Sequence, residues 1–296
     1  MQLPQRDEDV AGYVAELGLP GLVDIHVHFA PPSVQRAIWA YFDRLEGPAW
    51  PIAYRAPAQQ RLEMLSALGV RLHTALAYAH KPDMAAFLND YTLDLAARET
   101  GVLPTFTFYP EQGVETYVAE ALDAGGQVAK VHLQVGRFHA TDPRLDEVWR
   151  ELARRRVVVI LHAGAVYGVD GGAEYCGADE VAALLDRHPD LVIVIAHLGA
   201  PDFGDFLVLA ERTPGLYLDT AMVLTDPPYI GCYPEALRDR LLRLHPRILF
   251  GSDFPTIPHD HAAQVRGVAT AGWGPEELRG ILHDNAVALL ERVGGV

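Results

Sequence analysis

Two apolar runs decide the fold class: VVVILH at residues 157–162 and LVIVIAH at residues 191–197. Successive side chains of a strand point to opposite faces, and in these two runs both faces are apolar. Strands of this kind belong to a parallel sheet that is covered on both sides. The sequence therefore predicts an α/β protein.

Strand-like runs and helix-like segments alternate along the whole chain. Helical spacing of apolar residues is found at 82–100, 142–155 and 179–188, and a last helix runs from Pro275 to about Arg292. Eight strands that are each followed by a helix predict a (β/α)8 barrel, a fold of ~250 residues. A doubly wound sheet is the competing fold, but the chain has no Gly-rich nucleotide loop. We expect a single domain over residues 1–296. The six other strand-like runs are 21–27, 70–79, 102–108, 128–135, 215–220 and 246–252.

Composition and charge exclude several classes of protein. The chain has 24 Lys and Arg against 39 Asp and Glu, a formal charge of −15, whereas nucleic-acid binders normally carry the opposite sign. No run reaches the ~20 apolar residues of a membrane span. The first 18 residues are acidic and polar, and two cysteines make no disulfide framework. We expect a cytoplasmic enzyme that acts on a small molecule and binds neither nucleic acid nor membranes; a homodimer is left open.

Three long connections follow the first, fifth and seventh predicted strands, at residues 29–56, 163–177 and 221–234. In a barrel, connections of this kind build the active-site face. The first of them is rich in Trp, Tyr and Phe, which suggests a lid over an apolar or aromatic substrate. The alternative is that these are surface loops with a small core of their own.

The segment Asp24-Ile-His-Val-His28 is the clearest chemical signal. Residues 24, 26 and 28 of one strand point to one face, so two imidazoles can bind the same metal. Such a pair is weak evidence by itself. Its position at the end of the first strand, before a long loop, strengthens it.

Other polar residues recur at the ends of predicted strands. His162 ends the fifth strand, His197 ends the sixth, and Asp253 follows the eighth. The spacings from His26 onward are 136, 35 and 56 residues, which fit four, one and two repeats of roughly 31 residues. These groups therefore converge on one mouth of the barrel.

The motifs HVH, HAG, AHLG and GSDFP, in this order, resemble the amidohydrolase superfamily. More narrowly, they resemble the branch that includes the aminocarboxymuconate-semialdehyde decarboxylase-like enzymes. The resemblance implies a divalent metal, most often zinc and one per chain, held by His26, His28, His162 and Asp253. It also implies that His197 is a catalytic base, an electrophile or a ligand of a second metal. Asp253 would accept a proton from the attacking water and pass it to the leaving group.

Other polar residues near the predicted mouth have less certain roles. Lys130 is predicted to bind substrate or to pair with Asp24 in the barrel wall, although some superfamily members carboxylate a lysine on this strand to bridge two metals. Arg137 could clamp a substrate carboxylate, or be a solvated surface residue. His259 and His261 are expected to line the surface of the last βα helix.

Three functions are compatible with this sequence. The first is a metal-dependent hydrolase of an amide, ester or lactone, with a cyclic or carboxylate-bearing substrate. The second is a metal-dependent decarboxylase of an aromatic or muconate-like acid. The third is a metal barrel without catalysis, which the complete set of predicted ligands disfavours. We expect the hydrolase.

Overall fold

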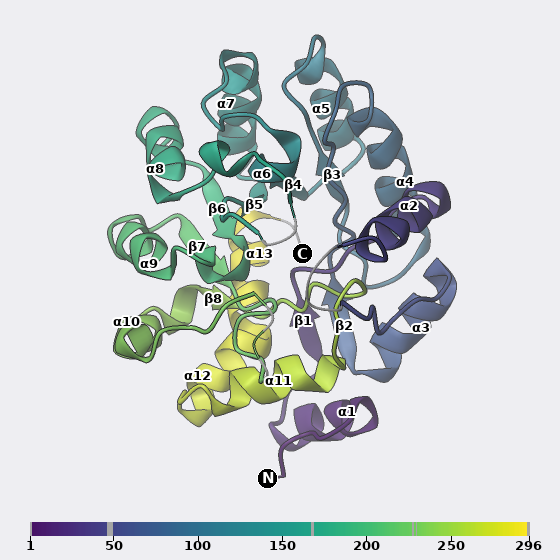
Figure 1. Cartoon of the computed structure of the whole chain (residues 1–296), viewed down its shortest axis with the longest axis vertical. Helices are drawn as coiled ribbons and strands as arrows, with labels where there is room; N and C mark the ends of the chain where they lie inside the picture. Colours follow the sequence, from purple (N-terminus) through teal and green to yellow (C-terminus); the bar gives the residue numbers. More distant parts are fainter. Residues whose placement is uncertain (1, 46–49, 167–168, 227, 229, 295–296) are drawn as a thin grey trace.

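The computed structural model describes residues 2–45, 50–166, 169–226, 228 and 230–294. Its strands form a barrel with helices arranged around it, as Figure 1 shows. Every strand pairing is parallel. The strands are β1 (Leu22–Asp24), β2 (Val70–His73), β3 (Thr105–Thr107), β4 (Val128–His132), β5 (Val158–His162), β6 (Val192–Ile195), β7 (Leu216–Asp219) and β8 (Ile248–Leu249).

The barrel closes through isolated backbone pairs at two seams. Strands β3 to β8 form one continuous sheet in chain order, while β1 and β2 pair separately. His73 pairs with Val102 between β2 and β3, and Val27 pairs with Phe254 between the segments that follow β1 and β8. The prediction of a (β/α)8 barrel is confirmed.

The helices occupy the positions that the sequence predicts, and several additional ones occur in the connections. The predicted helix 142–155 is a 3-10 turn followed by α7, and the predicted last helix contains a π-helical turn over Gly280–Asp284. The α-helices are α1 (Asp7–Glu16), α2 (Pro32–Phe42), α3 (Ala58–Ala67), α4 (Ala85–Arg98), α5 (Val114–Asp123), α6 (Leu133–Gly136), α7 (Asp146–Arg155), α8 (Ala178–Arg187), α9 (Phe203–Arg212), α10 (Arg238–Arg243), α11 (His261–Thr270), α12 (Pro275–Arg279) and α13 (Asn285–Val293).

The predicted strands are longer than the observed ones because the chain turns at the mouth. The run 128–135 ends as a strand at His132, since residues 133–136 wind into α6. The run 191–197 ends at Ile195, because His197 and Leu198 adopt left-handed backbone angles, with φ of 57° and 51°. The residues that carry the chemistry therefore lie where regular structure stops.

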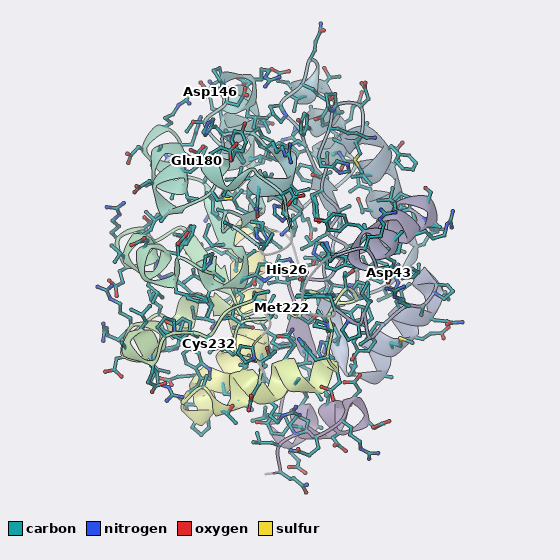
Figure 2. The ribbon with its side chains drawn as sticks, in the orientation of Figure 1. His26, Asp43, Asp146, Glu180, Met222 and Cys232 are labelled. Atoms are coloured by element: carbon teal, nitrogen blue, oxygen red, sulfur yellow. The ribbon has the colours of Figure 1, made fainter. Side chains whose placement is uncertain are left out.

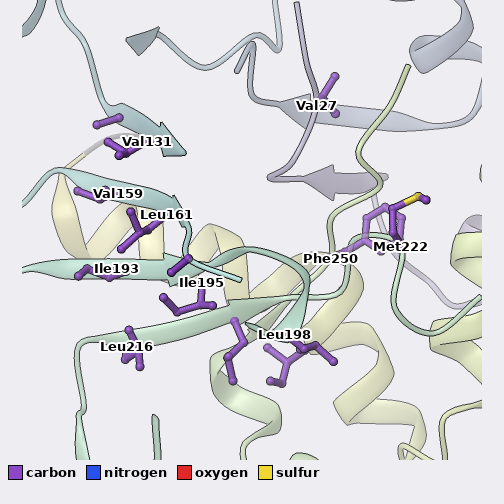
Figure 3. Close-up of a cluster of buried hydrophobic side chains, with 14 of the residues drawn as sticks. Val27, Val131, Val159, Leu161, Ile193, Ile195, Leu198, Leu216, Met222 and Phe250 are labelled. Atoms are coloured by element: carbon purple, nitrogen blue, oxygen red, sulfur yellow. The ribbon is translucent and has the colours of Figure 1, made fainter. Parts of the chain in front are cut away.

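The two faces of the barrel strands have different surroundings. Figure 3 shows side chains of the outer face, such as Val131, Leu161 and Ile193, which belong to the large core shared with the helices. On the inner face Val128 and Ile160 pack with Leu289 of α13, which closes the amino-terminal end of the barrel. The inner face is therefore apolar at this end. Among the described residues, no helix has the length and apolar character needed to cross a membrane.

The aromatic connection 29–56 is partly anchored beside the loop that follows β8. Trp50 donates a hydrogen bond from Nε1 to the carbonyl of Thr256 (2.9 Å), and the ring of Tyr54 packs on that of Phe254. Residues 46–49 of this connection lie outside the described residues, as do 167–168, 227 and 229 of the other two long connections. The lid over the substrate stays a prediction.

Candidate metal centre

His26, His28 and Asp253 meet at the mouth of the barrel, near the centre of the view in Figure 2, where His26 is labelled. Asp253 Oδ1 lies 3.0 Å from His28 Nε2 and 3.6 Å from His26 Nε2. Main-chain bonds fix this arrangement: the Asp253 amide donates to the His26 carbonyl (2.8 Å), and the His28 amide to the Phe254 carbonyl (2.7 Å). The loop after β8 thus brings the carboxylate to the two imidazoles.

The outward nitrogen of each imidazole faces a hydrogen-bond acceptor, so the inward nitrogen is the one that can bind a metal. His26 Nδ1 lies 2.8 Å from Asp219 Oδ2, and His28 Nδ1 lies 3.1 Å from the carbonyl oxygen of Leu76. Both partners only accept hydrogen bonds, so each Nδ1 carries the proton and each Nε2 presents a lone pair. Metal-binding histidines are usually held in this way.

The charge state of these groups also suits a divalent cation. Burial lowers the pKa of His26 well below its usual value, so this imidazole is neutral. Burial opposes ionisation of Asp253, but the adjacent imidazoles of His28 and His26 hold its pKa below the usual range. Neutral imidazoles and an ionised carboxylate are the donors that zinc and similar metals bind. The three residues therefore fit such an ion.

His197 lies beside this group. Its ring centre is 4.9 Å from that of His26 and 4.8 Å from that of His162. His197 Nδ1 donates to the carbonyl of Ala221 (2.9 Å), so Nε2 is its free nitrogen. The geometry suits a group that exchanges a proton with a substrate.

Asp219, at the end of β7, is a site residue that we did not predict from the sequence. It is fully buried, and it also accepts the main-chain N–H of His197 through Oδ1 (2.9 Å). With His26 and His197 it makes a second cluster that could hold a metal. Both oxygens of Asp219 already accept hydrogen bonds, so we interpret it as a support for the two histidines. Its position at the end of a predicted strand is the feature of the sequence that could have identified it as a site residue.

His162 lies beside His197, with ring centres 4.8 Å apart. Its ring stacks on that of His132, with centres 3.8 Å apart and planes at 9°. It belongs to neither of the two groups of close ligand atoms found among the described residues. Burial lowers the pKa of both histidines, so both rings are neutral. A role for His162 as a fourth ligand stays a prediction.

Tyr78, which we also did not predict, packs against His132, with ring centres 5.0 Å apart.

Lys130 is buried in the barrel next to the metal group. Its Nζ lies 3.3 Å from His26 Nε2. Burial lowers the pKa of Lys130 to about 8, although the nearby Asp219 and Asp253 oppose this shift. The amine thus lies within reach of a substrate at the mouth.

The predicted pairing of Lys130 with Asp24 is wrong. The strand ends at Asp24, and the bend at Ile25 breaks the alternation that would have placed residues 24, 26 and 28 on one face. Asp24 instead accepts the main-chain N–H groups of His26 (3.2 Å) and Ser252 (3.0 Å), and its Oδ2 lies 3.4 Å from His261 Nε2. His261 is fully buried, so its predicted surface position is also wrong.

Arg137 is exposed and lies outside this cluster of histidines. It follows α6 and donates a hydrogen bond to the carbonyl of Asp170 (2.5 Å). Its side chain lines a cavity of about 740 Å³, together with Tyr109, Arg144 and Tyr175. No hydrogen bond or ion pair joins Arg137 to the imidazoles in the part of the chain that the structure describes. A clamp on a substrate carboxylate stays a prediction.

Gly251 allows the segment after β8 to pass close to His26. An alanine Cβ at this position would lie 2.8 Å from the His26 Cβ, so Gly251→Ala should displace that ring. We expect weaker metal binding and a free energy of unfolding lower by about 1–3 kcal/mol, the usual cost of overpacking. Gly12→Ala in α1 is the control, because its Cβ would meet no atom within 4 Å. Metal titration and thermal melts measure both effects. Unchanged metal affinity in Gly251→Ala would contradict the close packing described.

Comparisons with known proteins place this arrangement in context. Residues 23–292 match the sequence model of a family described as amidohydrolase. An uncharacterised TIM-barrel protein of Bordetella bronchiseptica has a similar structure, with a TM-score of 0.73, 21% identity, and coverage of 92% of this chain and 99% of that one. The 5-carboxyvanillate decarboxylase of Sphingomonas paucimobilis has a TM-score of 0.65 and 17% identity, with coverage of 92% of this chain and 99% of that one. The dihydroorotase of Campylobacter jejuni has a TM-score of 0.56 and 15% identity, with coverage of 92% of this chain and 83% of that one. At these identities the similarity shows the fold alone. No curated protein matches this chain in sequence.

Proposed function

Because the chain belongs to the amidohydrolase family, we propose that it is a metal-dependent hydrolase of a small amide, ester or lactone. The observation that carries this proposal is the convergence of His26 Nε2, His28 Nε2 and Asp253 Oδ1 at the barrel mouth. These atoms would hold one divalent metal, which we propose is zinc. When bound, such an ion makes water a better nucleophile at neutral pH and polarises a carbonyl group.

The residues around this position have distinct roles in the proposed reaction. Asp253 is ionised and partly exposed, so it can accept a proton at Oδ2 and return it to the leaving group. His197 presents Nε2, from which a neutral imidazole can accept a proton or, once protonated, donate one. In this proposal Lys130, whose Nζ lies 3.3 Å from His26 Nε2, binds a negatively charged substrate group. These roles favour a substrate with a carboxylate close to the bond that is cleaved.

Metal analysis followed by a substrate screen tests the proposal. The panel contains lactones, cyclic amides and aromatic acids, and hydrolysis and CO2 release are measured separately. We expect metal-dependent hydrolysis of at least one lactone or amide. Release of CO2 without hydrolysis would instead make the protein a decarboxylase, and full activity in metal-free protein would refute both functions.

Replacing Lys130 with methionine should test its role as a substrate-binding residue. We expect Lys130→Met to keep one metal per chain and to raise KM for a carboxylate substrate roughly 10–100-fold, since a hydrogen bond to a charged group contributes about 1.5–3 kcal/mol. Metal content and steady-state kinetics measure the two effects. An uncharged substrate of the same reaction is the control and should show a smaller change.

The contrary result would be two metals per wild-type chain and activity that depends on bicarbonate. Such behaviour would mean that Lys130 reacts with CO2 and bridges two ions, which would also make His197 a ligand of the second.

A further inference from the structure

The carboxylate of Asp219 joins the side chain of one site histidine to the main chain of another. Resting on the function proposed above, we infer that Asp219 is a positioning residue. Through Oδ2 it fixes the tautomer of His26, and through Oδ1 it holds His197 in its place. Strand β7, which supplies none of the proposed ligands, would thus orient two groups of the site.

The bond to His26 determines which nitrogen of that ring can bind a metal. The Nδ1–Oδ2 distance is 2.8 Å, and both side chains are buried. Burial raises the pKa of Asp219, while His197, Lys130 and the main-chain N–H donors act to lower it. In its ionised form the carboxylate only accepts hydrogen bonds, so the proton of His26 then lies on Nδ1. The other side of the ring requires the same tautomer, because Lys130 Nζ, which donates when protonated, lies 3.3 Å from Nε2. Two independent contacts therefore agree that Nε2 carries no proton.

The bonds from Oδ1 support an unfavourable backbone conformation. His197 and Leu198 both have left-handed φ angles, which cost roughly 1 kcal/mol or more for residues other than glycine. Asp219 Oδ1 accepts the N–H of His197 (2.9 Å) and that of Ala221 (3.1 Å). Ala221 in turn accepts the proton of His197 Nδ1 through its carbonyl oxygen (2.9 Å). The turn after β7 thereby sets the conformation and the tautomer of His197.

Asparagine at position 219 separates the two functions of the carboxylate. Its oxygen can still accept the N–H groups of His197 and Ala221, while its NH2 group faces His26 and donates to Nδ1. In the opposite orientation of this amide, its NH2 group would face the main-chain N–H groups of His197 and Ala221. Donors would then face donors, so this orientation is disfavoured. Asp219→Asn should therefore move the His26 proton to Nε2, the atom proposed to bind metal. Asp219→Ala removes both functions.

Nitrogen NMR of 15N-histidine-labelled, metal-free protein reads the tautomer directly, with His26→Gln used to assign the signal. We expect wild-type His26 to be protonated on Nδ1 and the Asp219→Asn variant on Nε2. Metal titration should show affinity lower by roughly 10–100-fold in Asp219→Asn, the usual effect of losing such a partner. At saturating metal, kcat should be lower in Asp219→Ala than in Asp219→Asn, because only alanine releases the His197 main chain.

Asp24→Asn is the matched control, because Asp24 is equally buried and also accepts two main-chain N–H groups, but its Oδ2 approaches His261. It should keep the wild-type tautomer of His26. Wild-type protein with the proton on Nε2 would overturn the inference even if no variant folded, and so would an Asp219→Asn variant with unchanged tautomer and metal affinity. If the wild type bound no metal, the proposed function would fail, while the NMR signal would still decide the role of Asp219.

Discussion

Replacing His26 and His28 together with alanine is expected to give a folded barrel that binds no metal and has no measurable activity. The two Nε2 atoms are two of the three donors that converge at the mouth, and Asp253 alone cannot hold a catalytic ion. The barrel should still form, because its core lies in the apolar layers on both faces of the strands. Elemental analysis, circular dichroism and turnover measure the three properties.

His73→Ala is the control for this double variant. His73 is also a buried histidine, at the end of β2, but its Nδ1 bonds the main chain of Thr74 and its ring stacks on Phe29. This variant should lose stability and keep its metal. A double variant of His26 and His28 that retained a full equivalent of metal would show that the ion binds elsewhere.

Replacing His197 with alanine is expected to leave metal binding intact and to lower turnover by ~10²-fold or more, the scale of general acid–base catalysis. The reason is its position: its ring lies beside the group of His26, His28 and Asp253, with Nε2 free. Metal content and kcat are measured on the same preparations. A parallel loss of metal and activity would instead identify His197 as a ligand.

The sequence predicts the eight strands and the convergence of polar groups because both follow from simple periodicity. A buried parallel strand is apolar on both faces, and every strand of a barrel ends at the same mouth. The runs 157–162 and 191–197 therefore locate β5 and β6 within one or two residues. The same reasoning brings His26, His28 and Asp253 together.

Departures from regular structure explain what the sequence could not predict. Alternation along a strand places Asp24 on the face of His26, but the bend at Ile25 turns it toward His261. His197, whose backbone is left-handed, donates its main-chain N–H to the carboxylate of Asp219, a contact between residues 22 positions apart that no local pattern encodes. Residues that support the site were missed because their role depends on tertiary contacts.

The packing of α13 against the inner face of the barrel has a consequence for biosynthesis. Leu289 and Leu290 share their apolar layer with Val23 and Ile25, which come more than 260 positions earlier in the sequence. On a translating ribosome, this layer is therefore incomplete until residues 286–290 have been synthesised, although other members such as Leu76 and Leu103 emerge much earlier. Contacts so distant in sequence are slow to form, and the unfinished barrel exposes apolar surface meanwhile. Nascent chains of this protein should thus depend on chaperones until α13 has left the exit tunnel.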